Sequence, residues 1–259
     1  MDSTIANPNP EKVIARTSEC MRRLIEAGLT YDDLQRPIDD PDMRNRLVRF
    51  WQSGGYEPTT TQKLARAIGI PVFGIEEAVQ HFGVKPTRTQ LSALAEIPFT
   101  EAELRECKDT HILVAVFPMS ILEIRGKVSG SQRLFYDQGW YNKQVFAKEK
   151  GKTEWRLVRK TPIDSSISKT WPEQQALLSD KEETPSAQVM VYTIIGHFLA
   201  TGERLFEHIY VRTSSVASVG CRVHVGLFVA HGLFVYFYDV GDRSDSVGLS
   251  SSQKVQSQG

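Results

Sequence analysis

Three aspartates near the end of the chain, Asp239, Asp242 and Asp245, recur at every third position. Carboxylates grouped in this way could hold Ca²⁺, which prefers hard oxygen ligands. The D-x-x-D-x-x-D spacing differs from the alternate-residue spacing of an EF-hand loop. A solvated turn rich in Asp and Ser is the simpler interpretation, so we favour it over a metal site.

Histidine and cysteine show no catalytic or metal-binding spacing. The histidines are His81, His111, His197, His208, His224 and His231. They lack the tight i, i+4 spacing or the paired cysteines that a zinc site needs. Serine-hydrolase, Walker, dinucleotide-binding and zinc-protease motifs are also absent from the sequence. We therefore expect no catalytic activity, no metal ion and no cofactor.

The overall charge and the cysteines limit the possible partners and setting. The chain has 31 basic and 31 acidic residues in 259, which gives no electrostatic reason to expect a nucleic-acid or anionic-membrane partner. Residues 1–12 lack the basic and apolar regions of a signal peptide, and no apolar run has the length of a membrane span. Cys20, Cys107 and Cys221 are odd in number and far apart. We expect a soluble protein in the reducing cytoplasm. The oligomeric state stays open.

Residues 9 to about 106 have helical periodicity. Asn9 and Pro10 predict a helix that ends at Gly28, and Asp40 and Pro41 predict a second one that ends at Gly54. Shorter helices are predicted at about 62–68, 75–82 and 87–96, followed by one that begins at a capping box of Thr100 and Glu103. We interpret residues 1–105 as a helical N-terminal module.

The pattern changes near Asp109. The segments 111–128 and 154–163 are rich in Val, Ile and Leu, which indicates strands. Helices are predicted from Thr170 to about Ser179 and from Thr184 to just before Gly202, and strands follow from Ile209. The last ten residues resemble a frayed tail. The fold class predicted for the whole chain is α+β.

Residues 62–96 offer an alternative function. Two short helices there follow one another with an intervening glycine, loosely as in a helix-turn-helix, which would make the chain a DNA-binding regulator. However, Glu76 and Glu77 lie at the start of the second helix, where a recognition helix meets phosphates. We therefore favour packing of these helices against the rest of the chain, and expect no nucleic-acid partner for the protein itself.

The C-terminal region has an unusual composition. Lys, Glu, Gln, Met and Trp together make up 54 of the 259 residues, yet none of them occurs in the 45 residues between Glu207 and Gln253. These five types are the ones that an asparagine codon, AAC or AAT, cannot reach when only its adenines are changed. A preference for β-forming residues explains much of the deficit, but it does not explain the missing Trp.

This region resembles the variable region of the target proteins of diversity-generating retroelements, in which adenine-directed copying diversifies Asn-type codons. Such regions commonly lie on a C-type-lectin-like fold and are framed by R-V-x-x-G-G-x-W and N-x-x-x-G-F-R. Arg222, Val223 and Gly226 match the opening of that frame, and the segment 247–249 matches its close. Leu227 stands where the second glycine of the frame is expected.

The resemblance implies a C-type-lectin-like ligand-binding domain over residues 106–254, with a variable region at about 217–252. Arg222 and Asp242 would belong to its frame. Glycines 226, 232, 241 and 248 would serve an irregular backbone, and exposed aromatic side chains would act as anchors. The expected ligand-binding residues are Cys221, His224, Leu227, Val229, His231, Phe234, Tyr236, Phe237, Tyr238, Ser244 and Ser246.

The function expected from these observations is non-catalytic binding of varied partners, each a protein or a surface polymer. An ordinary buried strand is the competing interpretation of Phe234–Tyr238. A third possibility is an enzyme of the related formylglycine-generating lectin-like fold, which would need a cysteine pair from Cys107 and Cys221. The identity of the ligand and the role of residues 1–105 stay open.

Overall fold

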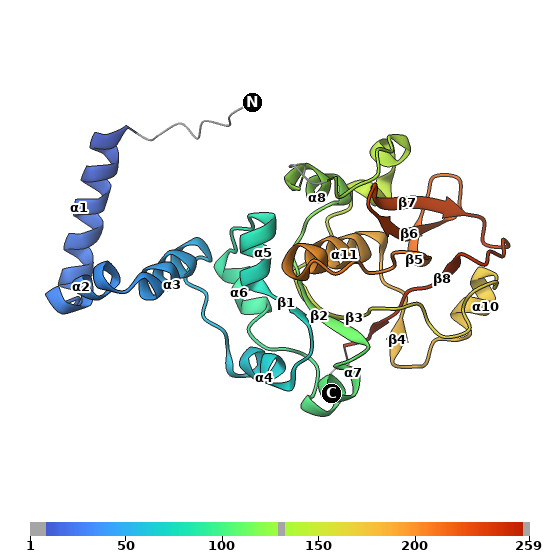
Figure 1. Ribbon diagram of the computed structural model, residues 1–259, viewed down its shortest axis with the longest axis horizontal. Helices are drawn as coiled ribbons and strands as arrows, with labels where there is room; N and C mark the ends of the chain where they lie inside the picture. The colour runs from blue at the N-terminus through green and yellow to red at the C-terminus, as the bar shows by residue number, and fades with distance from the viewer. Residues whose placement is uncertain (1–8, 129–132, 256–259) are drawn as a thin grey trace. The chain divides into compact units, whose positions relative to one another are not determined.

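The computed structural model describes residues 9–128 and 133–255 of the chain. It has a mixed α+β architecture with two β-sheets (Figure 1). The chain divides into two compact units, with the boundary between Trp51 and Gln52. The sequence placed a boundary at 105/106, so residues 52–105 belong to the second unit and not to a separate helical module.

The described part of the first unit is helical. It contains α1 (Pro10–Glu26), α2 (Tyr31–Asp39) and α3, which runs from Pro41 to Gln52 at the unit boundary. The Asn9 side chain accepts a hydrogen bond from the Glu11 amide, as expected of an N-cap. The helix α2 was not predicted, and it begins at a capping box of Thr30 and Asp33. No side chain described between residues 9 and 51 is buried, so local capping and not a core defines these helices.

Four short helices open the second unit. They are α4 (Thr60–Ile68), α5 (Ile75–Phe82), α6 (Arg88–Ala93) and α7 (Glu101–Cys107), all close to the predicted positions. Ala65, Phe82 and Leu104 on these helices lie in one continuous core with Ile112 and Val235. This shared core is the physical reason why residues 52–105 do not form a module of their own.

The first sheet has the strand order β1-β2-β3-β9-β4. Its strands are β1 (Val72–Phe73), β2 (His111–Val116), β3 (Glu154–Arg159), β4 (Glu182–Glu183) and β9 (Ser252–Gln253). The pair β1–β2 is parallel and the other pairs are antiparallel. Every residue of β2 is buried, which explains the continuous apolar run in its sequence.

The predicted strand over 111–128 is wrong in its second half, which forms helix α8 (Ile121–Lys127). Pro118 lies just past the end of β2. The Ser120 side chain then accepts from the Glu123 amide at 3.2 Å, while the Glu123 carboxylate accepts from the Ser120 amide at 2.8 Å. This capping box was visible in the sequence and outweighs the apolar composition.

The end of the chain is not a frayed tail as far as residue 255. Ser250, Ser251 and Ser252 are buried. Strand β9 pairs Ser252 with Val158 of β3 and with Glu183 of β4. Residues 256–259 lie outside the described residues. The prediction failed because polar serines can be buried when a sheet takes up their backbone groups.

Helix α11 (Ala187–Thr201) is the central helix of the second unit (Figure 1). Gly202, with φ of 78°, ends it as predicted from the sequence, whereas its start is capped by Ser186, two residues after the predicted start at Thr184. The helix contacts β1 and β2 of the first sheet and β5 and β6 of the second. Its residues 187–197 are all buried, which accounts for an apolar character on every side.

The second sheet has the strand order β7-β6-β5-β8. Its strands are β5 (Tyr210–Val216), β6 (Arg222–Val229), β7 (Gly232–Tyr238) and β8 (Val247–Leu249). The pairs β5–β6 and β6–β7 are antiparallel, while β5–β8 is parallel. The remaining short helices are η1 (Trp140–Lys143), α9 (Val145–Lys148) and α10 (Trp171–Gln175), the last of which ends earlier than predicted. None of the helices in residues 9–128 and 133–255 is long and apolar enough to cross a membrane.

Candidate ligand-binding face

The side chains of strand β7 differ in burial along the strand. Leu233 and Val235 are 1% and 0% exposed and belong to the core. Phe234 and Tyr238 are half-buried, and Tyr236 is 45% exposed. This alternation follows from the two-residue period of a strand, so Phe234, Tyr236 and Tyr238 share the face opposite the core. The run is therefore neither wholly buried nor wholly exposed.

Neighbouring strands add two more rings to this face. The register places His224 of β6 beside Tyr236. The ring centroid of His224 lies 4.7 Å from that of Tyr210 on β5 and 4.8 Å from that of Tyr238. The residues that we call the aromatic face are Tyr210, His224, Phe234, Tyr236 and Tyr238.

A segment far away in the sequence extends the aromatic face. Tyr136 stacks on Phe234 with ring centroids 4.0 Å apart and planes at 17°. Tyr136 is 38% exposed, so the two rings present a stacked edge to solvent. The Tyr136 amide also donates to the Leu233 carbonyl, and the Trp140 indole N–H donates to the Val235 carbonyl. The segment around 134–140 therefore covers part of the outer edge of β7, and no sequence pattern predicted it.

Phe237 has a different position from the one expected. Its side chain is half-buried and packs against the core, with its ring centroid 4.8 Å from that of Trp140. It also stacks on Tyr236 at 5.3 Å. Phe237 was predicted as an exposed binding residue, but it acts as a support for Tyr236 because strand alternation turns it toward the core.

His224 was also predicted as an exposed binding residue, and it is only 1% exposed. Burial, with a smaller contribution from Arg212, lowers the pKa of its imidazole to about 3. The ring is therefore neutral at pH 7, and its Nδ1 has no hydrogen-bond partner among the described residues. His224 forms the floor of the aromatic face below Tyr210 and Tyr238.

The charged residue that holds the frame is Arg212, which sequence reasoning missed. Arg212 is fully buried, and its guanidinium donates to the carbonyl oxygens of Lys169 and Asp242 at 3.0 and 2.7 Å. It also donates to Gln174 Oε1 at 3.1 Å. These bonds join α10 and the 239–242 turn to β5. The signal that could have found it is a lone arginine in the strand-like stretch Tyr210–Val216.

The predicted frame pair of Arg222 and Asp242 is replaced by other contacts. The Arg222 guanidinium lies 4.3 Å from the ring centroid of Trp171 and donates to the Ser214 carbonyl. The Asp242 carboxylate accepts from the Asp239 amide at 3.3 Å, and the Asp239 carboxylate accepts from the Gly241 amide at 2.9 Å. Both aspartates thus stabilise their own turn, as the solvated-turn interpretation predicts.

Two of the four glycines expected to serve an irregular backbone have positions that only glycine can occupy. Gly226 has φ of 146°, and a Cβ there would lie 2.2 Å from the Ile209 carbonyl oxygen. Gly232 has φ of 104°, and a Cβ there would lie 2.4 Å from the carbonyl carbon of Phe135. Leu227, at the position where the frame has its second glycine, adopts φ of 47° beside a register shift of β6 against β7. A left-handed backbone at this site is unusual for a leucine.

The other predicted binding residues do not gather in one place. Val229 and the exposed His231 lie at the β6–β7 hairpin, whereas Cys221 lies at the opposite end of β6. Ser244 and Ser246 bond each other through their hydroxyls at 3.0 Å, and the Ser246 carbonyl accepts from the Tyr210 amide. Ser246 therefore adjoins Tyr210 of the aromatic face.

Comparisons with known proteins give no help at this point. No protein-family model, curated protein or solved structure matches the chain. The interpretation of the aromatic face therefore depends on its geometry.

Potential metal ligands do not cluster in the described residues, and the cysteines are unpaired. Among the described residues, no group of three or more His, Cys, Asp or Glu side chains could hold a metal ion. Cys107 and Cys221 are both free thiols, and burial raises the pKa of the Cys107 thiol to about 11. A raised pKa opposes the formation of a reactive thiolate.

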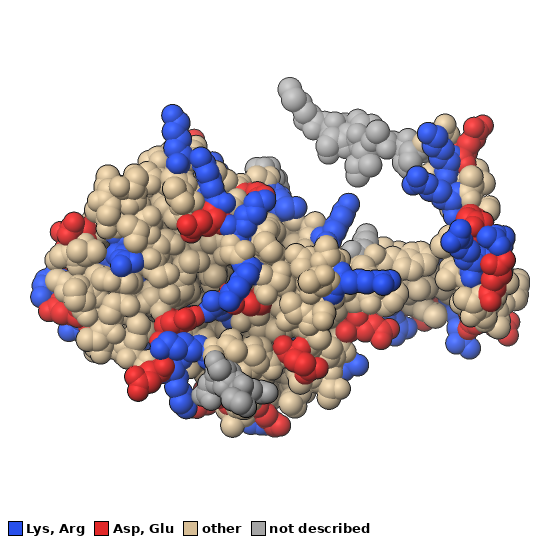
Figure 2. All heavy atoms as spheres, turned by 180° about the vertical axis from the view of Figure 1, so that it is seen from behind, with Lys and Arg blue, Asp and Glu red and all other residues tan. Residues whose placement is uncertain are grey.

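The segment 62–96 lacks the short turn of a helix-turn-helix. Strand β1 lies between α4 and α5 and pairs with β2. Glu77 caps α5 through the Gly74 amide and forms an ion pair with Arg66 at 2.8 Å. Figure 2 shows one face of the second unit, on which Lys and Arg side chains are interspersed with Asp and Glu. These observations favour packing of the two helices over DNA binding.

Proposed function

We propose that this chain is a non-catalytic ligand-binding protein whose aromatic face is diversified by a retroelement to bind varied partners. The observation that carries the proposal is the alternation along β7, which separates Tyr236 and its neighbours on the aromatic face from Leu233 and Val235 in the core. Side chains on such a face can change while the core stays the same. We further propose that the sheet β7-β6-β5-β8 of the second unit has a C-type-lectin-like fold.

The residues that fix the sheet differ from those that form the aromatic face, and this supports diversification. The sheet is fixed by features that do not involve the aromatic side chains: the buried Arg212 and the close backbone approaches at Gly226 and Gly232. An arrangement of this kind tolerates many side chains at exposed positions, because few core contacts are lost.

The shape of the face favours an extended partner. Tyr136 and Tyr236 are 38% and 45% exposed, and tyrosine gives a large contact area at a low cost in side-chain entropy. The aromatic face lies on the surface of the sheet formed by β5, β6 and β7. A protein or a surface polymer fits such a face better than a small molecule, which usually binds in a concave pocket.

A display library tests whether the face can bind. Positions 234, 236, 238 and 244 would be randomised with NNC codons, and the library would be selected against a purified test protein. The control library would randomise four exposed positions outside the face, at Glu101, Arg105, Glu106 and Lys108 on or next to α7. We expect specific binders from the first library only. Equal recovery from the two libraries would contradict a dedicated binding face.

The gene tests the diversification itself. A near-repeat of the codons for 217–252, differing mainly at adenines, should lie close to a reverse-transcriptase gene. Deep sequencing of populations with an intact and a deleted reverse transcriptase should show changes at codons 234, 236 and 238 in the intact strain alone. Codon 212 should be constant in both populations. A locus without the repeat would rule out the retroelement.

A further inference from the structure

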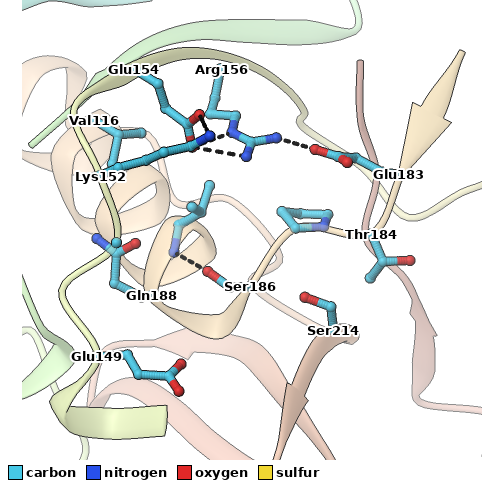
Figure 3. A pocket seen from close by; sticks show the side chains of 13 residues that line it. Val116, Glu149, Lys152, Glu154, Arg156, Glu183, Thr184, Ser186, Gln188 and Ser214 are labelled. Carbon is cyan, nitrogen blue, oxygen red and sulfur yellow. Dashed lines mark hydrogen bonds and ion pairs between the residues drawn. The ribbon is translucent and has the colours of Figure 1, made fainter. Parts of the chain in front are cut away.

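A cavity of about 500 Å³ lies in the second unit away from the aromatic face. Its walls come from β3, the 149–152 loop, the segment between β4 and α11, and the Ser214 region of β5 (Figure 3). Val116, Pro185 and Val189 are buried residues of its lining. The volume is within the range of small-molecule sites.

The cavity contains one buried polar atom without a partner, Gln188 Oε1. Gln188 is only 2% exposed, and its Nε2 donates to the Met119 carbonyl at 2.8 Å. Because that bond requires the NH₂ group to face Met119, the amide orientation is fixed and Oε1 must point the other way. A buried carbonyl oxygen with both lone pairs unused is costly unless a donor reaches it.

The space beside this oxygen is kept open by Gly151. The residue has φ of 69°, and a Cβ there would lie 2.8 Å from Gln188 Oε1. Any larger residue at 151 would therefore crowd the atom that lacks a donor.

The charges around the cavity favour a positively charged ligand. Glu149, Glu154 and Glu183 line it together with Lys152 and Arg156. Both cations are already occupied: Lys152 pairs with Glu154 at 3.2 Å, and Arg156 pairs with Glu154 and Glu183. The Glu149 carboxylate forms no ion pair with a residue in 9–128 or 133–255. In Figure 3, Glu149 lies on the same side of the cavity as Gln188, opposite Glu183 and Thr184.

We propose that this cavity is a binding site for a small molecule with a primary ammonium group, which donates to Gln188 Oε1 and is balanced by the Glu149 carboxylate. An ammonium carries three donors and one positive charge, which match an acceptor without a donor and a carboxylate without a partner. The site is independent of the aromatic face, because no residue of that face lines the cavity.

Three probes that share a propyl chain separate hydrogen bonding from charge. Propylammonium has N–H donors and a charge, N,N,N-trimethylpropylammonium has the charge alone, and 1-propanol has a single donor without charge. Each would be titrated into the ¹⁵N-labelled full-length chain, with the amide resonances of Gly151, Ser186 and Gln188 as the readout. We expect saturable shifts in the millimolar range for propylammonium and at least fivefold weaker binding of the other two probes.

Variants locate the site. Gln188→Met removes the acceptor and should abolish propylammonium binding, while Glu149→Gln should weaken it about fivefold. Glu106→Gln, at an exposed carboxylate of α7 outside the cavity, should leave binding unchanged. If Gln188→Met does not fold because the Met119 carbonyl loses its donor, propylammonium binding by Gly151→Ala is the deciding measurement. The alanine Cβ would lie beside Gln188 Oε1, so binding should be lost. Equal binding of propylammonium and its trimethyl analogue, no saturable shift, or unchanged binding by Glu149→Gln and Gly151→Ala would overturn the proposal.

Discussion

Arg212 Nη2 donates a hydrogen bond of 2.7 Å to the main-chain carbonyl of Asp242, thirty residues away in the sequence. The same guanidinium bonds the Lys169 carbonyl and the Gln174 side chain. One buried side chain thus connects strand β5 to helix α10 and to the 239–242 turn. Arg212→Met should cost about 3 kcal/mol of unfolding free energy, because several buried carbonyls lose their donor at once.

The 239–246 turn should lose hydrogen-exchange protection in this variant before the core strands do. Arg243→Met is a matched control on the same turn, since Arg243 is 55% exposed and pairs with Glu173 at 2.6 Å. An exposed pair of this kind contributes less than about 1 kcal/mol. Urea denaturation would measure the unfolding free energy of the two variants. Equal decreases for Arg212→Met and Arg243→Met would show that Arg212 does not hold the frame.

Tyr236→Ser and Val235→Ser form a second pair, on adjacent residues of β7. Tyr236 is 45% exposed and Val235 is 0% exposed. We expect Tyr236→Ser to lower the free energy of unfolding by less than about 1 kcal/mol. Val235→Ser should lower it by about 3 kcal/mol or more, because this change puts a hydroxyl into the core. Phe237→Ser should fall between them, since its ring packs on Trp140. A loss of several kcal/mol for Tyr236→Ser would mean that the aromatic face is a part of the core.

The buried His224 should make the protein less stable in mild acid. Burial lowers the pKa of His224 to about 3 and that of His111 to about 4 in the folded state. In the unfolded chain a histidine takes up a proton below about pH 6.5, so folding stability is intact above that pH and falls as the pH decreases toward these folded pKa values. Each histidine contributes up to about 1.4 kcal/mol per pH unit over this window.

His224→Phe should therefore reduce, without abolishing, the pH dependence of the unfolding free energy between about pH 6.5 and 4.5, because burial also lowers the pKa of His111 and of His81. His208→Gln is the control, as its side chain is 85% exposed. Urea denaturation at several pH values is the measurement. An unchanged slope for His224→Phe would mean that the imidazole reaches solvent.

Leu227 offers a test of the frame at one backbone position. Its φ of 47° costs a leucine about 1 kcal/mol relative to a glycine. Leu227→Gly should leave the stability within about 1 kcal/mol of the parent, because relief of strain offsets the lost side-chain contacts. Leu227→Val should lower the stability more than Leu227→Gly does, since a β-branched residue fits a left-handed backbone poorly. Thermal unfolding of both variants checks this, and a better result for Leu227→Val would argue against the left-handed backbone.

Local signals in the sequence predicted much of the second unit. Thr100 with Glu103 and Thr170 with Glu173 are capping boxes in which a side chain bonds a backbone group three residues away, and each begins a helix as expected. Gly202 ends α11 for an equally local reason, its left-handed φ of 78°. The capping box of Ser120 and Glu123 had the same form, yet the apolar composition around it led to the wrong prediction of a strand.

The amino-acid sequence by itself determined many of the helix ends and the strand character after Ile209, because these depend on residues within a few positions of one another. Only the tertiary structure decided which side of β7 faces the core, that His224 is buried and Phe237 supports Tyr236, and that Arg212 and not Arg222 holds the turn. The same is true of Tyr136 on Phe234 and of Ser252 in the first sheet. These features arise from contacts between segments far apart in the chain, and local propensity carries no information about such contacts.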